Sequence, residues 1–420
     1  MRRVIKYGGT SLATPAHFEQ AARAVAGLVE VGEQIAVVVS AMADETDRLL
    51  REMSECGGTA VDSGTLLNYL SMGEEKSVLL MSAALQAQKV GTVTLHPRWR
   101  ESWPLIVDSD DDSPVAPIKT NEERSFSVRT QKTSNRFMKN VLPHLRLGRV
   151  PVISGFMALS SRDELVTLGR GGSDITAFVA GRYIDADEVI VVTDVEGVLS
   201  ADPTLAQNPR ILDNLTVEDA EVIARSGARV VHPRAFRFMT ADMRVRIVDF
   251  RRQSELVKTG TTITGESKTT IFRNDNRLAA LVLVGSGWAN RPGILGNMAN
   301  ILGENDIAIS ASTSGSRFIV FYIDEDVAEK AHRLLHDAVG EDRETFTNIT
   351  LRGNIGELRL RSPDFMDKPG ALGDLVRALT HRGVGIVEVV TSLSDIHIYV
   401  PWDDLESAYE CMLKFFKSKY

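Results

Sequence analysis

Near the amino terminus, a lysine and a glycine pair follow an apolar run in a pattern that could bind phosphate. Lys6 comes after Val4-Ile5, and Gly8-Gly9 and Thr10-Ser11 come next. Paired glycines let backbone N–H groups approach an anion because no Cβ intervenes, and a helix starting there would add partial positive charge. A nearby lysine can neutralise a transferring phosphoryl group. The spacing is not that of a Walker A loop, and a plain tight turn is the simpler interpretation of the glycines alone.

A second glycine-rich segment, Gly169 to Asp174, contains one arginine and precedes an apolar-periodic run. Ser173 or Asp174 can cap the helix that the run predicts. Arg170 can bind a carboxylate through two parallel hydrogen bonds. A helix start without a ligand is the alternative, but so many glycines around one arginine favour a binding loop.

Two other segments place polar side chains where a ligand could bind. Thr193 to Gly197 comes directly after the apolar run Val189 to Val192, and ligands bind at the carboxyl ends of parallel strands in open α/β sheets. Glu74 and Glu75 stand near a predicted helix start. Such acids usually face solvent and complement the helix dipole, but a carboxylate here could instead hold a substrate ammonium.

The sequence gives little support to several classes of protein. His232, before Pro233, has no paired Ser or Cys nucleophile and no HExxH context, so it is typical of a turn rather than of a hydrolase or zinc peptidase. The 420 residues carry a net charge of −8 without a basic block, which disfavours a nucleic-acid partner. No apolar stretch of about 18 residues predicts a membrane span, and no signal peptide is evident. Cys56 and Cys411 are far apart, which fits a reducing compartment, so we expect a cytoplasmic location.

The predicted strands and helices that must position these segments indicate an α/β domain. Apolar runs at 34–39, 150–153 and 188–192 alternate with helical patterns such as 15–31. Continuous β-branched runs separated by helices predict a mostly parallel sheet sandwiched between helices. The acidic run from Asp108 to Ser113 is interpreted as a mobile surface loop, because it lacks the spacing of a calcium loop.

An internal repeat follows this domain. Arg291 to Gly296 recurs 77 residues later as Lys368 to Gly373, and the offset continues without gaps, so that Tyr322 matches Tyr399. Each copy reads as strand, Pro-Gly turn, helix, strand, strand and helix. The repeat therefore predicts two copies of one α+β unit packed together, with a role in binding or assembly.

In this order, the segments resemble those of the aspartate kinase family over nearly the whole chain. The matching segments are Lys6–Ser11 (K-[FY]-G-G-T-S), Val39–Ala41 (V-S-A), Gly73-Glu74 (G-E), Gly155-Phe156 (G-F), Gly169–Asp174 (G-R-G-G-S-D), Thr193–Gly197 (T-D-V-x-G), Gly227–Pro233 (G-A-x-V-x-H-P) and Gly260–Ile263 (G-T-x-I). The resemblance implies an amino-acid-kinase fold over residues 1–265. It also implies two ferredoxin-like ACT modules, at 276–345 and 353–420.

The resemblance further implies phosphorylation of the aspartate side chain by ATP and Mg²⁺, the first step toward lysine, threonine and methionine. The implied catalytic residues are Lys6, Gly8, Gly9 and Asp174. The implied substrate-binding residues are Thr10, Ser40, Glu74, Arg170, Gly171 and Ser173. The implied nucleotide-binding residues are Thr193, Asp194, Gly197, Asp202 and Arg229. The metal would be held through the ATP phosphates.

Three positions depart from the family pattern. Arg229 replaces the usual lysine, Leu199 stands where an aromatic residue is common, and Thr204 stands where an arginine is common. An arginine fork differs in reach from an ammonium, so the nucleotide contacts are expected to differ. Two alternatives therefore stay open: a related kinase with another acceptor, or a catalytically weak regulatory homologue.

For the repeat, the resemblance implies feedback control by an amino acid bound between modules. The residues expected near such sites are Pro292, Gly293, Ser312, Pro369 and Gly370. Paired modules also suggest a homodimer or a higher homo-oligomer. Modules that serve only in dimerisation are the alternative.

Overall fold

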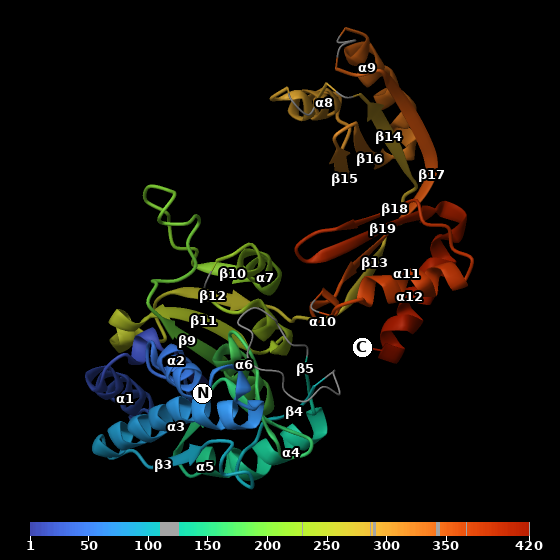
Figure 1. The fold of residues 1–420 in the computed structure, drawn as a ribbon. Helices are drawn as coiled ribbons and strands as arrows, with labels where there is room; N and C mark the ends of the chain where they lie inside the picture. The colour runs from blue at the N-terminus through green and yellow to red at the C-terminus, as the bar shows by residue number, and fades with distance from the viewer. Residues whose placement is uncertain are drawn as a thin grey trace. The chain divides into compact units, whose positions relative to one another are not determined.

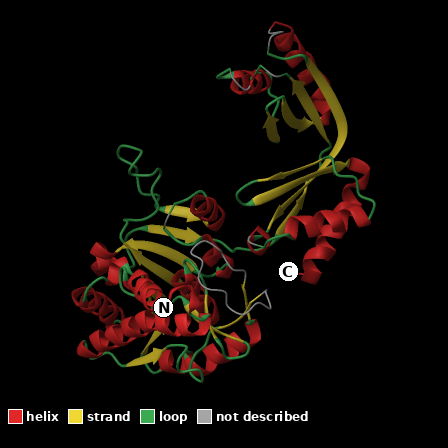
Figure 2. Ribbon diagram, in the orientation of Figure 1, coloured by secondary structure: helices red, strands yellow, loops and turns green. Residues whose placement is uncertain are grey.

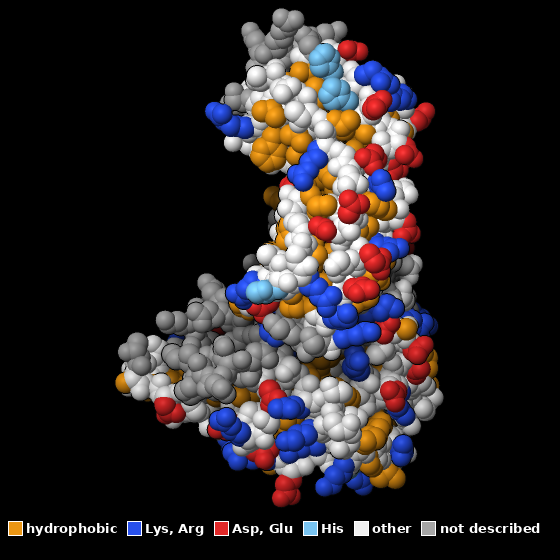
Figure 3. All heavy atoms as spheres, turned by 90° about the vertical axis from the view of Figure 1, so that its right-hand side faces the viewer, with side chains coloured by type: hydrophobic (Ala, Val, Ile, Leu, Met, Phe, Trp, Pro, Cys, Tyr) orange, Lys and Arg blue, Asp and Glu red, His pale blue; other side chains and the backbone are white. Residues whose placement is uncertain are grey.

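The computed structural model describes residues 1–109, 126–228, 230–285, 287–288, 291–341, 345–366 and 368–419. The chain divides into two compact units, Met1–Ser267 and Lys268–Tyr420 (Figure 1). Within the described ranges, no helix has both the length and the apolar character needed to cross a membrane. Acidic and basic side chains lie interspersed on the face that Figure 3 shows.

The first unit is built on a sheet in which every neighbouring pair is parallel except β11 and β12. In sheet order, the strands are β10 (Asn214–Thr216), β12 (Thr261–Thr264), β11 (Arg244–Asp249), β9 (Glu188–Thr193), β1 (Arg2–Tyr7), β2 (Gln34–Val39), β6 (Val150–Ser154) and β3 (Thr92–Leu95). The predicted buried strands at 34–39, 150–153 and 188–192 are therefore confirmed as β2, β6 and β9.

Alternate side chains of the central strands enter two separate cores. In β1, Val4 packs into one core, whereas Ile5 and Tyr7 pack into the other. In β2, Ala36 and Val38 lie in the first core, and the alternate residues lie in the second. Each fully buried aliphatic side chain contributes about 1.5–3 kcal/mol, so both faces need a helical cover. This explains the unbroken apolar runs and confirms the predicted fold class.

Helices supply that cover on both faces (Figure 2). The second core receives α1 (Pro15–Glu30) and α3 (Ser63–Ala87), and the first receives α4 (Thr130–Asn140), α6 (Gly172–Tyr183) and α7 (Val217–Arg225). The remaining helices are α2 (Glu45–Gly57) and α5 (Leu142–Arg146), and short 3-10 turns are η1 (Thr10–Leu12), η2 (Gly58–Ala60), η3 (Pro233–Phe238) and η4 (Phe250–Glu255).

A second, four-stranded sheet stands beside the α3 and α4 region. Its order is β5 (Phe126–Val128), β4 (Ile106–Ser109), β7 (Met157–Ser160) and β8 (Leu165–Thr167). The hairpin β7–β8 joins two of the segments singled out in the sequence, Gly155-Phe156 and Gly169 to Asp174. The predicted acidic loop begins at the end of β4, and residues 110–113 lie outside the described residues.

The second unit is one antiparallel sheet in the order β15-β16-β14-β17-β19-β18, with β13 also pairing with β17. The strands are β13 (Thr270–Arg273), β14 (Leu278–Val284), β15 (Ala311–Gly315), β16 (Phe318–Asp324), β17 (Asn348–Arg361), β18 (Glu388–Thr391) and β19 (Asp395–Pro401). The first half of β17 pairs with β14, and its second half pairs with β19 and β13. Both repeats therefore share one long strand, which bulges near Asn354, where φ is +58°.

Each repeat packs its own pair of helices on one face of this sheet. The helices are α8 (Ile294–Gly303) and α9 (Ala328–Glu341) in the first, and α11 (Ala371–His381) and α12 (Leu405–Lys419) in the second, with the short α10 (Pro363–Met366) before α11. The rings of Tyr322 and Tyr399, equivalent in the repeat, stack at 3.8 Å. The Tyr322 hydroxyl donates to Glu388. These elements match the predicted α+β repeats.

Candidate active site

The segments that the sequence analysis singled out as candidate binding or catalytic loops lie together at the carboxyl edge of the main sheet. Gly8-Gly9 follows β1, Ser40 follows β2, Gly155 follows β6, and Thr193 ends β9. These strands are neighbours and parallel, so their carboxyl ends lie side by side. This is the edge at which open α/β sheets bind ligands.

At the centre of this edge, Lys6 and Asp174 form an ion pair. Lys6 Nζ lies 2.7 Å from Asp174 Oδ1, and the two side chains are only 12% and 10% exposed. Asp174 lies in the first turn of α6, where the helix dipole favours a carboxylate. Its Oδ2 accepts a hydrogen bond of 3.0 Å from the backbone N–H of His232. The lysine ammonium is therefore held by one oxygen of a carboxylate whose other oxygen is fixed by the backbone.

In the glycine pair after β1, close packing requires Gly9, whereas a Cβ on Gly8 would make only ordinary van der Waals contact. A Cβ on Gly9 would stand 2.8 Å from the carbonyl oxygen of Ala41, and one on Gly8 would stand 3.5 Å from Lys6 Nζ. The Gly8 N–H donates to Val192 O at 3.3 Å. The helix that begins directly after the glycines is the single 3-10 turn η1. Thr10 is exposed at the start of η1.

The second glycine-rich segment is shaped by left-handed backbone and by contacts that exclude a Cβ. Gly169 and Gly171 have φ of +76° and +68°. A Cβ on Gly171 would stand 2.2 Å from His232 Cβ, and one on Gly155 would stand 2.4 Å from Ser173 Oγ. The loop therefore packs against both η3 and the end of β6.

Arg170 is exposed between the two left-handed glycines of this loop. Just before it in the chain, the hairpin β7–β8 begins at Phe156, whose φ is +63°. Positive φ is rare for a bulky residue and marks stored strain. Sequence reasoning matched Phe156 to a family motif but did not predict its backbone conformation, because positive φ usually signals glycine.

Glu74 is a buried carboxyl beside the Lys6–Asp174 pair. It lies in α3, is 3% exposed, and accepts a backbone hydrogen bond from Ala41. Burial raises the pKa of Glu74 to about 8, although Ala41 and the Lys6 charge act in the opposite direction. Its Oε2 makes no hydrogen bond to any residue in the described part of the chain. A buried, unsatisfied carboxylate oxygen is costly unless a ligand pairs with it.

The predicted nucleotide segment continues from the end of β9. The Thr193 hydroxyl donates to Asp194 Oδ1 at 3.2 Å. Gly197 has φ of +148°, and a Cβ there would stand 2.6 Å from Thr261 Oγ1. Thr193 ends β9, and Asp194 and Gly197 lie in the loop after it, at the carboxyl edge next to the central strand β1.

Two other predicted nucleotide residues are placed differently. Asp202 is exposed and caps its own loop, because its Oδ1 accepts from the Thr204 backbone at 2.8 Å and from the Thr204 hydroxyl at 2.7 Å. The threonine that departs from the family pattern is therefore a partner of Asp202. Arg229 lies outside the described residues.

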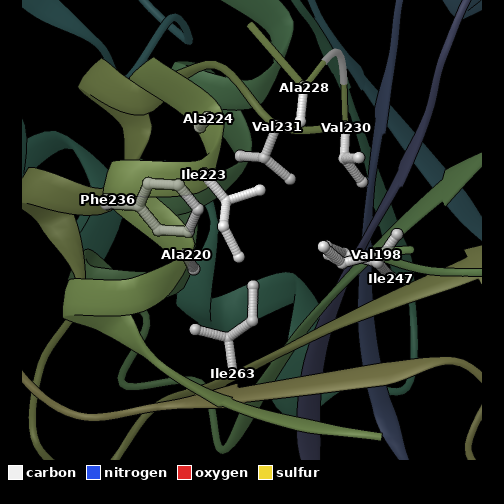
Figure 4. A pocket seen from close by; sticks show the side chains of 10 residues that line it. All are labelled: Val198, Ala220, Ile223, Ala224, Ala228, Val230, Val231, Phe236, Ile247 and Ile263. Atoms are coloured by element: carbon white, nitrogen blue, oxygen red, sulfur yellow. The ribbon is translucent and has the colours of Figure 1, made fainter. Parts of the chain in front are cut away.

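The neighbours of Arg229 line a small apolar cavity between α7 and the sheet (Figure 4). Its lining residues are Val198, Ala220, Ile223, Ala224, Ala228, Val230, Val231, Phe236, Ile247 and Ile263. A volume of about 10 Å³ is room for about one water molecule. The cavity is a packing gap under α7 and is too small for a nucleotide base.

In the second unit, the predicted regulatory residues occupy equivalent places in the two repeats. Pro292-Gly293 precedes α8 and Pro369-Gly370 precedes α11, with φ of +87° and +79° at the two glycines. Ser312 lies in β15, paired with Phe321. The Pro-Gly turns therefore set the start of each helix, a role that explains the glycines without a ligand.

Residues 1–249 match the amino acid kinase family, and residues 281–339 match the ACT domain. The chain therefore belongs to the amino acid kinase family. Aspartokinase 2 of Bacillus subtilis (strain 168) is 25% identical over 97% of this chain and 96% of its own length. The aspartokinase of Mycobacterium tuberculosis (strain ATCC 25618 / H37Rv) is 28% identical over 96% and 92%.

Solved structures agree on the fold. The aspartate kinase from Synechocystis gives a TM-score of 0.75 at 22% identity, covering 99% of this chain and 69% of that chain. E. coli aspartokinase III in complex with aspartate and ADP gives 0.52 at 19% identity, covering 97% and 98%. Together with the full-length relatives, these matches confirm the predicted resemblance and the kinase class.

Proposed function

We propose that the first unit transfers the γ-phosphoryl group of ATP to the side-chain carboxylate of aspartate, giving 4-phosphoaspartate and ADP. The observation that carries the proposal is the Lys6–Asp174 pair beside buried Glu74, at the carboxyl edge of the sheet. The Lys6 ammonium, held by Asp174, supplies a fixed cation, and Glu74 supplies an unsatisfied acceptor. A fixed cation suits an anionic phosphoryl donor, and an unsatisfied buried acceptor suits the ammonium group of an amino acid.

In the proposed reaction, an oxygen of the aspartate side chain attacks the γ-phosphorus. The bond to the bridging oxygen breaks, and ADP leaves with the electron pair. The attacking group is already a carboxylate at neutral pH, so no general base is needed, and positioning and electrostatics carry the rate. Lys6 would neutralise charge on the transferring group, with Gly8 and Gly9 keeping the space open. Asp174 would keep Lys6 in place.

Recognition of the acceptor would use its two charged ends. Arg170 would bind the α-carboxylate through its fork, and Glu74 would bind the ammonium with its unpaired Oε2. Thr10, Ser40, Gly171 and Ser173 would complete the pocket. A dicarboxylate without the ammonium should therefore be a poor acceptor.

The nucleotide would lie over the ends of β1 and β9, and the proposed contacts are Thr193, Asp194, Gly197, Asp202 and Arg229. Among the described residues, no group of three or more His, Cys, Asp or Glu side chains could hold a metal ion. Mg²⁺ is commonly bound through substrate phosphates, waters and one or two carboxylates. On that pattern, Mg²⁺ would be held through the ATP phosphates, and it would supply charge neutralisation there.

The test is ATP turnover with aspartate, with the acyl phosphate trapped as its hydroxamate. Glutamate and succinate serve as controls for chain length and for the ammonium. Aspartate-dependent hydroxamate formation supports the proposal. Turnover only with another carboxylate would support a related kinase with a different acceptor, and no turnover with any of them would support a weak regulatory homologue.

We further propose that the second unit senses an amino acid and assembles a homodimer or higher oligomer. E. coli aspartokinase III has been solved in complex with lysine and aspartate, and the repeated Pro-Gly turns of this chain provide two candidate sites. Titrating lysine, threonine and methionine against the aspartate reaction tests this, and places the chain in a biosynthetic branch. The two cysteines are free, which supports a cytoplasmic location.

A further inference from the structure

The turn after β3 holds helix α3 on both sides of Glu74. His96, directly after β3, is fully buried, and its Nε2 lies 3.2 Å from the carbonyl oxygen of Ser71. Two residues on, Arg98 Nε lies 3.4 Å from Glu75 Oε2. The contacts reach α3 three residues before Glu74 and one residue after it.

The partners of His96 fix its proton. A carbonyl oxygen can only accept, so Nε2 must carry the hydrogen that bonds to Ser71. Nδ1 must be unprotonated, because it accepts the backbone N–H of Arg98 at 3.2 Å. Burial lowers the pKa of His96 to about 4, so the neutral ring keeps this arrangement at neutral pH. The ring edge also meets Trp99, 5.9 Å between centroids at 74°.

The bonded carbonyl points toward the turn that carries Glu74. In an α-helix, the carbonyl of residue 71 also accepts from the N–H of residue 75, so the imidazole adds a second, external donor there. On another side of the same turn, a Cβ on Gly73 would stand 3.4 Å from Ala41 Cβ. Helix α3 is thus held by the turn after β3 and lies close to Ala41, the residue that hydrogen-bonds Glu74.

We propose that His96 is a positioning residue for substrate recognition, which fixes α3 at Ser71 and so holds the Glu74 carboxylate where the substrate ammonium would bind. The inference rests on the proposed role of Glu74. A charged hydrogen bond is sensitive to small displacements, so a loose helix turn lowers affinity for the ammonium while leaving Lys6 and its pair in place.

The experiment compares His96→Leu with His96→Gln in the full chain. Leucine keeps the apolar volume but loses the donor, so KM for aspartate should rise about 10-fold, with kcat and KM for ATP changed less than about 2-fold. The Gln amide can still donate to the Ser71 carbonyl, so His96→Gln should recover most of the affinity. Inhibition by succinate, which has no ammonium, should be the same in all three proteins.

Matched controls separate this role from general destabilisation. His144→Leu changes a histidine on α5 that is only partly buried, and should leave KM for aspartate unchanged. Arg98→Met removes the half-exposed bridge to Glu75 and should raise KM about 2-fold, in a protein that keeps its fold even if His96→Leu does not. An unchanged KM in a folded His96→Leu, or equal changes in KM, kcat and succinate inhibition, would overturn the inference.

Glu74→Gln separates the two levels of the proposal. If Glu74→Gln raises KM for aspartate and His96→Leu does not, only the positioning role is wrong. If Glu74→Gln leaves KM unchanged, the proposed role of Glu74 is wrong, and the inference about His96 is wrong with it.

Discussion

Strand β1 carries a buried cation at each end, and the two ends are built differently. Near the amino end, Arg3 pairs with Glu188 at 2.8 Å and also with Glu33, while Arg246 pairs with the other Glu188 oxygen at 2.9 Å. Near the carboxyl end, Lys6 pairs with Asp174, and Glu74 nearby keeps one oxygen without a partner. Glu188 at the amino end has both oxygens bonded, whereas Glu74 at the carboxyl end keeps one for a ligand.

The comparison teaches that burial of charge alone does not mark a site. Glu188 is 1% exposed and both of its oxygens are bonded, so this carboxylate has no oxygen left for a ligand and should act on stability. The Lys6 end combines a fixed ammonium with an incomplete acceptor. Unsatisfied buried groups need a reason, and a substrate is the reason proposed here.

The largest expected effect is on the carboxyl end. Lys6→Ala should lower kcat for hydroxamate formation by about 10³-fold or more, because the developing phosphoryl charge loses its stabilising ammonium. The variant should keep its fold, because Asp174 retains the backbone hydrogen bond from His232. A near-normal rate in the variant would remove Lys6 from the mechanism.

A substitution at the amino end of β1 should lower stability and leave the catalytic rate unchanged. Glu188→Ala leaves two buried guanidinium groups short of a partner, so the free energy of unfolding should fall by about 3 kcal/mol, measured by denaturant titration. Folded enzyme at low temperature should keep its kcat. Loss of kcat without loss of stability would show that the two ends are not separate in function.

The affinity for aspartate should depend on pH through Glu74. Its pKa of about 8 means that at pH 7 only about one tenth of the free enzyme has the carboxylate that the ammonium requires, so KM for aspartate should fall about 10-fold between pH 7 and pH 9. Glu74→Gln should flatten this profile. A KM that stays constant across this range in the parent protein would contradict the proposed role.

The raised pKa of Glu74 also predicts that the folded protein loses stability as the pH rises. Protonated Glu74 is favoured in the folded state, so this contribution to stability is complete below the unfolded pKa and is lost as pH rises to about 8. Thermal melting of parent and Glu74→Gln proteins at pH 5 and pH 9 measures it, since the glutamine variant lacks the dependence.

The smallest expected effect tests whether the ion-pair network at the amino end of β1 depends on the geometry of its arginine side chains. Arg246→Lys keeps the charge but loses the fork that reaches Glu188, so the free energy of unfolding should fall by about 1 kcal/mol. Kinetic constants should not change. A loss as large as that of Glu188→Ala would mean that geometry, rather than charge, holds this network.

The sequence predicted the strands and the repeat because both depend on periodic apolar positions. The resemblance also identified Lys6, Glu74 and Asp174 as candidate site residues, and their roles stay predictions. The sequence could not predict the Ala41 and His232 backbone donors or the His96–Ser71 contact. Main-chain N–H and C=O groups are common to nearly all residues and leave no compositional signal.

Other parts of the fold were also beyond the sequence patterns. Asp202 was predicted from its motif to contact nucleotide, and the structure shows it bonded to Thr204 in its own loop; the nucleotide role stays a prediction. The pairing of β13 with β17 is a choice of partner among strands of similar pattern, and periodicity does not encode that choice.

The shared strand β17 also bears on how the second unit can be divided. It pairs with β14 of the first repeat and with β19 of the second, while β13, which precedes both repeats, completes the second. A chain cut between the repeats would deprive one repeat of an edge and expose unpaired strand backbone. The two repeats therefore form one structural unit. A deletion, exchange or graft of this unit must include all of it, from β13 to α12.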